Sequence, residues 1–297
     1  MDTSSAKTPA TPMLAGLAAI AERYDGFILD LWGTIHDGLQ PLAGAVECLD
    51  ALKARDKKIL ILSNAPRRSA AVEARMDRIG IPRGLYDHVL SSGEAAYIAI
   101  KERPADGHQA LGRACYFIGA EDDDSVVAGL DLKIVGEIGA ADFIAVIGVG
   151  REESVADYED LLREGAGRGL PLVCANPDLV VLRGAAREVC AGALAARYET
   201  LGGPVLYHGK PHAPIYARAF DILGIAERRR ILAVGDSLRT DVAGAKAAGI
   251  DSLFITSGIH AEALGTVPFE TPDAARLAAL YAEAGQHPGA ASPAFIW

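Results

Sequence analysis

The sequence predicts an α/β protein with a Rossmann-like parallel sheet and a second α/β module inserted into it. Short apolar runs alternate with amphipathic segments along the whole chain, a rhythm typical of parallel strands covered by helices. Runs that are apolar throughout, such as "KKILILSN" at 57–64, suit strands buried on both faces. The rhythm breaks at 104–108 and then resumes as a second α/β series, which indicates an insertion.

The individual elements follow from periodicity and from turn residues. Helical spacing covers 43–56 and 93–103, and the helix predicted at 67–80 ends in Gly80, a residue suited to helix termination. After the inserted series, a further helix is predicted at 187–202. The predicted strands lie at 26–32, 57–64, 86–92, 114–119, 131–137, 142–150, 170–176, 204–210, 229–237 and 251–258.

These elements divide the chain into a tail and two modules. Residues 1–12 are rich in Ser, Thr and Pro and predict a flexible tail. Residues 13–100 and 181–297 are assigned to the core, and 101–180 to the inserted module. The 297 residues are half hydrophobic, which is enough for two domains.

Composition narrows the functional classes. The net charge is −10 and no long Lys/Arg run occurs, so nucleic acid is not expected as a partner. No apolar run approaches the roughly 18 residues of a membrane span. The four cysteines lack CxxC spacing and predict reduced core thiols in a cytoplasmic protein. The oligomeric state stays open, with a homo-oligomer as one option.

Polar side chains follow several predicted strands at their carboxyl ends, where ligands bind in open parallel sheets. We expect these groups to converge at one sheet edge. A carboxylate among them can attack phosphorus, two carboxylates can hold Mg²⁺, and hydroxyl, amide and ammonium donors can bind phosphate oxygens. The residues are Asp30, Ser63, Asn64, Lys210, Asp236 and, five positions later, Asp241.

Four short motifs appear in a fixed order: "DLWGT", "LSN", "GKP" and "GDSLRTD". In this order they resemble the haloacid dehalogenase (HAD) superfamily, and the insertion between the second and third resembles its C2 cap. "SNAPRR" and "ANPD" are similar to the subgroup of NagD, p-nitrophenyl phosphatases and phosphoglycolate phosphatases. The resemblance covers almost the whole chain after Phe27. It implies a Mg²⁺-dependent phosphatase acting on a small phosphorylated metabolite, such as a sugar phosphate or a nucleotide.

The resemblance also implies a role for each motif residue. Asp30 would be the nucleophile and a metal ligand. The backbone carbonyl of Trp32 and the carboxylate of Asp236 would complete the protein's metal ligands. Asp241 would support the metal's waters or Lys210. Lys210 would neutralise the nucleophile and phosphate, and the phosphate would also be bound by Ser63 and Asn64.

Trp32 departs from the pattern of the phosphatases, which usually carry a second aspartate there to protonate the leaving group. An indole cannot transfer that proton. His36 and Asp37 are substitute candidates, although shaping the loop that faces the cap is the favoured role for both. Phosphonatase relatives instead form a Schiff base with a cap lysine, for which Lys101 and Lys133 are the nearest candidates.

Two alternatives to a phosphatase therefore stay open. One is a phosphometabolite-binding protein with negligible turnover, and the other is a hydrolase of C–P or C–X bonds. Asn176 and Asp178 in "ANPD" stay open as well, either as hinge residues or as residues that face the substrate.

Overall fold

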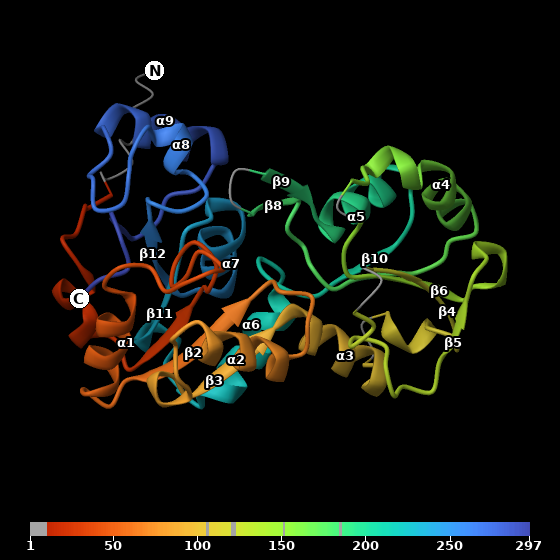
Figure 1. The fold of residues 1–297 in the computed structure, drawn as a ribbon, viewed down its shortest axis with the longest axis horizontal. Coiled ribbons are helices and arrows are strands. Elements are labelled where there is room, and N and C mark those ends of the chain that lie inside the picture. The colour runs from red at the N-terminus through yellow and green to blue at the C-terminus, as the bar shows by residue number, and fades with distance from the viewer. Residues whose placement is uncertain (1–10, 105–106, 120–122, 151, 184–185) are drawn as a thin grey trace, which may run out of the picture.

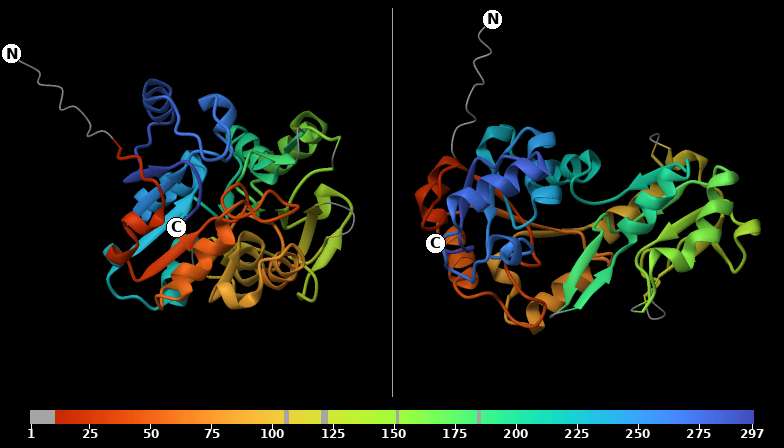
Figure 2. Two further views of the ribbon diagram at one scale, coloured as in Figure 1. Left: turned by 60° about the vertical axis from the view of Figure 1, so that its left-hand side comes forward. Right: turned by 90° about the horizontal axis from the view of Figure 1, so that it is seen from above.

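A computed structural model describes residues 11–297 apart from 105–106, 120–122, 151 and 184–185. The chain forms two lobes, each built around a parallel sheet, and the views of Figures 1 and 2 agree on this division. The predicted α/β class with parallel sheets is confirmed.

The first lobe contains a six-stranded sheet in the order β13-β12-β11-β1-β2-β3, and all of its paired strands are parallel. β1 lies between β11 and β2, so its carboxyl end lies in the middle of the sheet edge that the carboxyl ends of the strands form. The strands are β1 (Gly26–Leu29), β2 (Lys58–Ser63), β3 (His88–Ser91), β11 (Ile231–Gly235), β12 (Asp251–Ile255) and β13 (Ala290–Ser292).

Helices cover both faces of this sheet, as expected for its continuously apolar strands. On one face, α1 (Ala45–Lys53) and α2 (Ser69–Arg78) pack against alternate residues of β1 and β2. On the other face, α6 (Ala213–Leu223) and α7 (Ala243–Ala248) pack against the intervening residues. The helices α8 (Ala261–Leu264) and α9 (Ala274–Ala284) lie near β12 and β13.

The second lobe contains a five-stranded parallel sheet in the order β10-β7-β6-β4-β5. Its α4 (Glu159–Gly167) and α5 (Ala191–Thr200) cover one face. Its strands are β4 (Ala114–Ile118), β5 (Lys133–Val135), β6 (Phe143–Val146), β7 (Leu172–Cys174) and β10 (Val205–Tyr207).

One helix prediction needs correction. The segment predicted as a helix over 187–202 begins as a strand, because 186–189 form β9 and the helix α5 starts only at Ala191. β9 (Ala186–Val189) pairs antiparallel with β8 (Val180–Arg183), and this hairpin projects between the lobes in Figure 1. Cross-strand pairing therefore overrides the helical spacing at the start of this segment.

The second sheet reaches further along the chain than the sequence indicated. β10 ends at Tyr207 and pairs with β7, whereas the boundary expected at 180 would assign β10 and α5 to the core. We therefore propose 104–208 as the inserted unit. Of the expected tail, residues 1–10 lie outside the described part, and the Pro12 carbonyl accepts a hydrogen bond from the Ala291 amide at 2.9 Å.

The two lobes also share packing. α3 (Ser92–Glu102) follows β3, and its buried Ala96 and Ile100 belong to the apolar cluster of the second sheet. The chain's two connections between the lobes meet at His108 and His208, whose Nε2 atoms lie 2.9 Å apart. All four cysteines are buried thiols that are not joined in disulfides, as predicted. Within the described residues, no helix is long and apolar enough to cross a membrane.

Candidate active site

Asp30 is the first residue after β1, and its backbone amide continues the sheet ladder by donating to the Val234 carbonyl at 2.8 Å. Both of its carboxylate oxygens have partners. Oδ2 accepts from the Thr34 hydroxyl at 3.1 Å, and Oδ1 accepts from the Lys210 ammonium at 2.5 Å. These two contacts hold the carboxylate in one orientation at the sheet edge, where the side chain is 10 % exposed.

Lys210 is buried and bridges two carboxylates. Its Nζ donates to Asp30 at 2.5 Å and to Asp241 at 2.7 Å. Although burial by itself disfavours the ammonium, the charges of Asp241 and Asp30 raise the pKa of Lys210 above its usual value. The ammonium is therefore charged at neutral pH and compensates part of the negative charge around Asp30.

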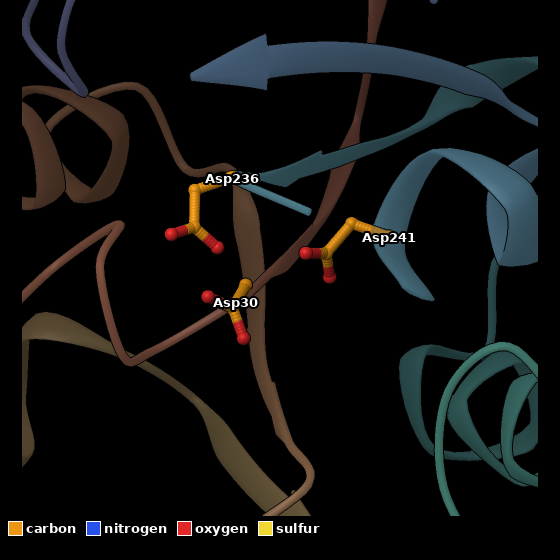
Figure 3. Close-up of side chains that lie close together, drawn as sticks. All are labelled: Asp30, Asp236 and Asp241. Carbon is orange, nitrogen blue, oxygen red and sulfur yellow. The ribbon is translucent and has the colours of Figure 1, made fainter. Parts of the chain in front are cut away.

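Asp236 and Asp241 bring two further carboxylates to this point. Ligand oxygens of Asp30, Asp236 and Asp241 all lie within 4.8 Å of one another, and Figure 3 shows the three carboxylates gathered at one place. Asp236 follows β11 and accepts from the Ile259 amide at 2.7 Å. Asp241 comes from the π-helical turn Leu238–Val242 and accepts from the Ser237 amide at 3.1 Å.

Three buried carboxyl groups face one ammonium in this cluster, so negative charges on them repel one another. Burial, with the charges of Asp30 and Asp241, raises the pKa of Asp236 well above its usual value. Burial also raises the pKa of Asp241, against the opposing effect of Lys210. Hard carboxylate oxygens at this spacing are the ligands that Mg²⁺ prefers, so the donor set fits that ion.

Gly33 allows the chain to pass close to this cluster. Its φ is +81°, a conformation that favours glycine. A Cβ at this position would overlap Oδ2 of Asp236. Any larger residue would therefore displace the carboxylate as well as strain the backbone.

Trp32 lies half-buried two residues after Asp30, and its ring contacts the loop that follows β1. A Cβ on Gly38 would overlap Cη2 of the indole, so the ring lies directly against this glycine. The ring also meets His36 edge-on, with centroids 5.4 Å apart. The indole thus packs within the loop, in keeping with a structural contribution.

His36 and Asp37 make contacts that shape the same loop. Nδ1 of His36 accepts from the Gly38 amide at 2.9 Å, and burial lowers the pKa of this imidazole to about 4. His36 is therefore neutral at pH 7. The exposed Asp37 accepts from two loop amides, those of Leu39 and Gln40. Although burial acts in the opposite direction, these amides together lower the pKa of Asp37, which stays ionised.

Ser63 and Asn64 end β2 but are used differently. The Ser63 hydroxyl oxygen accepts from the Ala65 amide at 3.2 Å, which orients its own hydrogen for donation. The Asn64 amide binds protein groups through all its polar atoms. Oδ1 accepts from the Lys210 backbone amide at 2.8 Å, and Nδ2 donates to the Lys210 carbonyl at 3.1 Å and to Asp178 at 2.9 Å. This arrangement favours a positioning role over the direct phosphate contact expected from the sequence.

Asn176 and Asp178 reach the site from the end of β7. The Asn176 side chain accepts from the Asp178 amide at 3.0 Å and so fixes the turn between them. Burial raises the pKa of Asp178, while its bond to Asn64 and the charge of Lys210 act in the opposite direction. Arg239 also contacts this turn, because its guanidinium donates to the Pro177 carbonyl at 2.5 Å. No sequence pattern indicated a role for this arginine.

Lys101 and Lys133, the sequence candidates for a Schiff base, do not join this group. Lys101 is exposed on α3 and Lys133 is exposed on β5, at the edge of the second sheet. The strand that leads to Lys210 also differs from the sequence prediction. The strand that precedes it, β10, belongs to the second sheet, so the lysine is not delivered by a strand of the core sheet.

Comparison with known families supports an enzyme of this fold. Residues 27–133 match the family described as haloacid dehalogenase-like hydrolase, and residues 207–278 match a second family described as HAD-hydrolase-like. A solved hydrolase of the haloacid dehalogenase-like family from Brucella suis 1330 is 35 % identical. The match covers 95 % of this chain and 100 % of that chain, with a TM-score of 0.80.

Two further relatives carry a named activity. D-glycerol 3-phosphate phosphatase of Mycobacterium tuberculosis is 29 % identical over 82 % of this chain, and the match spans 66 % of that protein's length. A solved glycerol phosphate phosphatase from Mycobacterium tuberculosis, in complex with magnesium, is 26 % identical. There the match covers 87 % of this chain and 77 % of that chain, with a TM-score of 0.63.

The fold, the carboxylate cluster and these matches define the class of the protein as an α/β enzyme that catalyses hydrolysis. More specifically, the chain belongs to the haloacid dehalogenase-like hydrolase family. The family resemblance drawn from its four motifs is thereby confirmed.

Proposed function

We propose that the protein is a Mg²⁺-dependent phosphatase that hydrolyses a small phosphorylated metabolite, such as a sugar phosphate or a nucleotide. The observation that carries this proposal is the position of Asp30. Its carboxylate ends the central strand, is paired with Lys210 at 2.5 Å, and lies in one cluster with Asp236 and Asp241. The phosphatase names of the relatives support the same reaction class.

In the proposed reaction, one carboxylate oxygen of Asp30 attacks phosphorus and the bond from phosphorus to the leaving oxygen breaks. The resulting aspartyl-phosphate is then hydrolysed by water, which regenerates Asp30 and releases phosphate. Lys210 offsets the negative charge of Asp30 and of the phosphate during both steps. The Ser63 hydroxyl, at the neighbouring strand end, donates to a phosphate oxygen.

Asp30, Asp236 and the backbone carbonyl of Trp32 would hold Mg²⁺, with Asp241 supporting its waters and Lys210. When bound, the ion would neutralise the excess negative charge of the cluster and of the phosphate. The fit rests on three buried carboxylates whose ligand oxygens lie within 4.8 Å. The magnesium found in the solved glycerol phosphate phosphatase is consistent with this assignment.

The second lobe would act as the cap that encloses the substrate and selects its leaving group, since water exclusion strengthens the electrostatic contacts in such a site. Asn176 and Asp178 reach the site from this lobe. We place the enzyme in the cytoplasm with a small phosphorylated substrate as its partner. Neither nucleic acid nor a membrane is part of the proposal.

The test is a phosphate-release screen with and without Mg²⁺. The panel contains sugar phosphates, nucleotides, glycerol phosphate and phosphoglycolate, with acyl phosphates and p-nitrophenyl phosphate as compounds with good leaving groups. We expect release that depends on Mg²⁺ and stops with EDTA. Turnover that is equal with and without the ion would contradict the metal assignment, and absence of release from every compound would contradict the phosphatase.

A second candidate is favoured by Trp32, because the indole packs on Gly38 and supplies no acid. The protein would then bind a phosphorylated metabolite and turn it over negligibly. Calorimetry on the same panel separates the two. Tight binding of a compound that is not hydrolysed over hours would favour this second function over the phosphatase.

A further inference from the structure

Two neighbouring strands of the second sheet point at the active site. β7 and β10 are parallel, with Cys174 opposite Tyr207. Their carboxyl ends therefore leave the sheet side by side. The chain after β7 supplies Asp178, and the chain after β10 supplies Lys210. The lysine that contacts the nucleophile is thus tethered to the lobe that does not contain the nucleophile.

Asn64, at the end of core strand β2, contacts both of these segments. Its side-chain amide forms two hydrogen bonds with the Lys210 backbone. Oδ1 accepts from the Lys210 N–H at 2.8 Å, and Nδ2 donates to the Lys210 carbonyl at 3.1 Å. The other hydrogen of Nδ2 goes to Oδ1 of Asp178 at 2.9 Å. With both hydrogens used, the plane of the amide is fixed, and it fixes the Lys210 backbone in turn.

The carboxylate of Asp178 is itself held in place. Its backbone amide donates to Asn176 at 3.0 Å, and the preceding carbonyl, that of Pro177, accepts from Arg239. The charged groups that act on Asp178 are Lys210, Asp30 and Arg239. Arg239 lies in the core, so the turn that carries Asp178 is attached to the core at two points, Arg239 and Asn64.

We propose that Asp178 and Asn64 form a positioning pair that holds Lys210 against Asp30. This inference rests on the proposed phosphatase function and assigns Asp178 a role distinct from contact with the substrate. Without Asp178, the Asn64 amide loses one of its two donor contacts and can rotate away from the Lys210 carbonyl. A displacement of a catalytic group by about 1 Å can cost about 10²-fold in rate.

The first test compares Asp178→Ala with Asp178→Asn. The alanine variant is expected to lower kcat by about 10²-fold, and KM much less. The loss should be equal for p-nitrophenyl phosphate and for glycerol phosphate, because Lys210 acts on the nucleophile and not on the leaving group. Asp178→Asn should recover kcat to within about five-fold of wild type, since a neutral amide oxygen accepts the same bond more weakly than a carboxylate.

A double-mutant cycle tests the link to Asn64. If the two residues act through one contact, Asn64→Ala combined with Asp178→Ala should be no slower than Asn64→Ala alone. Asp123→Ala is the matched control, because Asp123 makes another ion pair between the lobes, with Arg67 at 3.0 Å, that does not involve the Lys210 backbone. It should leave kcat within about two-fold of wild type. Circular dichroism confirms that each variant is folded.

Several outcomes would overturn the proposal. One is a folded Asp178→Ala variant with kcat close to that of wild type, and another is additive losses in the cycle. A third is a loss restricted to glycerol phosphate and shared by Asp178→Asn, which would make Asp178 a proton donor. Failure of the phosphatase function is a separate result, since wild type itself would then release no phosphate.

Discussion

The two parallel sheets differ most at the carboxyl ends of their strands. In the core sheet, β1 and β11 are followed directly by the buried, ionisable Asp30 and Asp236. In the second sheet, β7 and β10 end in Cys174 and Tyr207, and the first polar side chain after β7, that of Asn176, binds backbone. The two sheets therefore contribute differently to the same site. The core sheet carries the Asp30 and Asp236 carboxylates, whereas the segments that follow strands of the second sheet bring Lys210 and Asp178 to the site.

The strongest test of this division is Asp30→Asn, which we expect to lower kcat by about 10³-fold or more because an amide cannot attack phosphorus. Asp25→Asn is the matched control, since Asp25 precedes the same strand and pairs with Arg230 on the surface. It should retain nearly full activity. If the Asp30→Asn enzyme kept more than a few per cent of the wild-type rate, the covalent mechanism would be wrong.

The second prediction concerns metal binding by Asp236. Asp236→Ala should weaken Mg²⁺ binding by about 10²-fold or more. Losing a residue that only supports a metal ligand can already cost about 10²-fold in affinity, and Asp236 would be a ligand itself. Asp251→Ala tests the opposite edge of the same sheet, where the carboxylate is exposed and accepts from Tyr24. Calorimetric titration should show no change there. Unaltered affinity in the Asp236 variant would remove this residue from the metal site.

The third prediction compares one glycine from each lobe. Gly33 and Gly202 have similar positive φ values, 81° and 86°, so an alanine strains both backbones by roughly 1 kcal/mol. Only at Gly33 would the new Cβ meet the Asp236 carboxylate, whereas nothing lies within 4 Å at Gly202. Gly33→Ala should therefore also weaken Mg²⁺ binding, by about 10-fold. Equal metal affinities in the two variants would refute this contact.

The smallest expected effect is that of Trp32→Asp. Without an acid at this position, the wild-type rate should depend steeply on the pKa of the leaving group. Trp32→Asp should flatten that dependence and speed alkyl phosphates by about ten-fold, within the usual range of general-acid catalysis. Trp32→Phe keeps an aromatic ring against Gly38 and should keep the steep slope. Shallow slopes in all three proteins would mean that another group already supplies the proton.

Most of the core could be predicted because its signals are local. Continuous apolar runs mark β1, β2 and β11, and the polar residues at their carboxyl ends are Asp30, Ser63 and Asp236. Parallel pairing then brings neighbouring strand ends together, which requires no knowledge of side-chain orientation. The sequence thus indicated both the sheet and the carboxylates that gather at its edge.

The remaining features depend on tertiary pairing. The apolar run of β10 would suit either sheet, and only its register with β7 places it in the second one. Similarly, Asn64 follows β2 in a position suited to binding phosphate, but the direction of its amide is decided by Lys210 and Asp178. Such choices rest on contacts between segments far apart in the sequence, for which the local pattern carries no signal.

The short connection from Tyr207 to Lys210 constrains how this enzyme can be recombined with its relatives. An extended residue spans about 3.3 Å, so inserting or removing one residue at 208–209 would move the ammonium further than the length of its 2.5 and 2.7 Å contacts. A chimera that receives a foreign second sheet must therefore match the length of this junction. In the proposed mechanism, exchange of the second lobe would therefore also replace Lys210, unless the crossover point lies upstream of Tyr207 and leaves residues 207–210 unchanged.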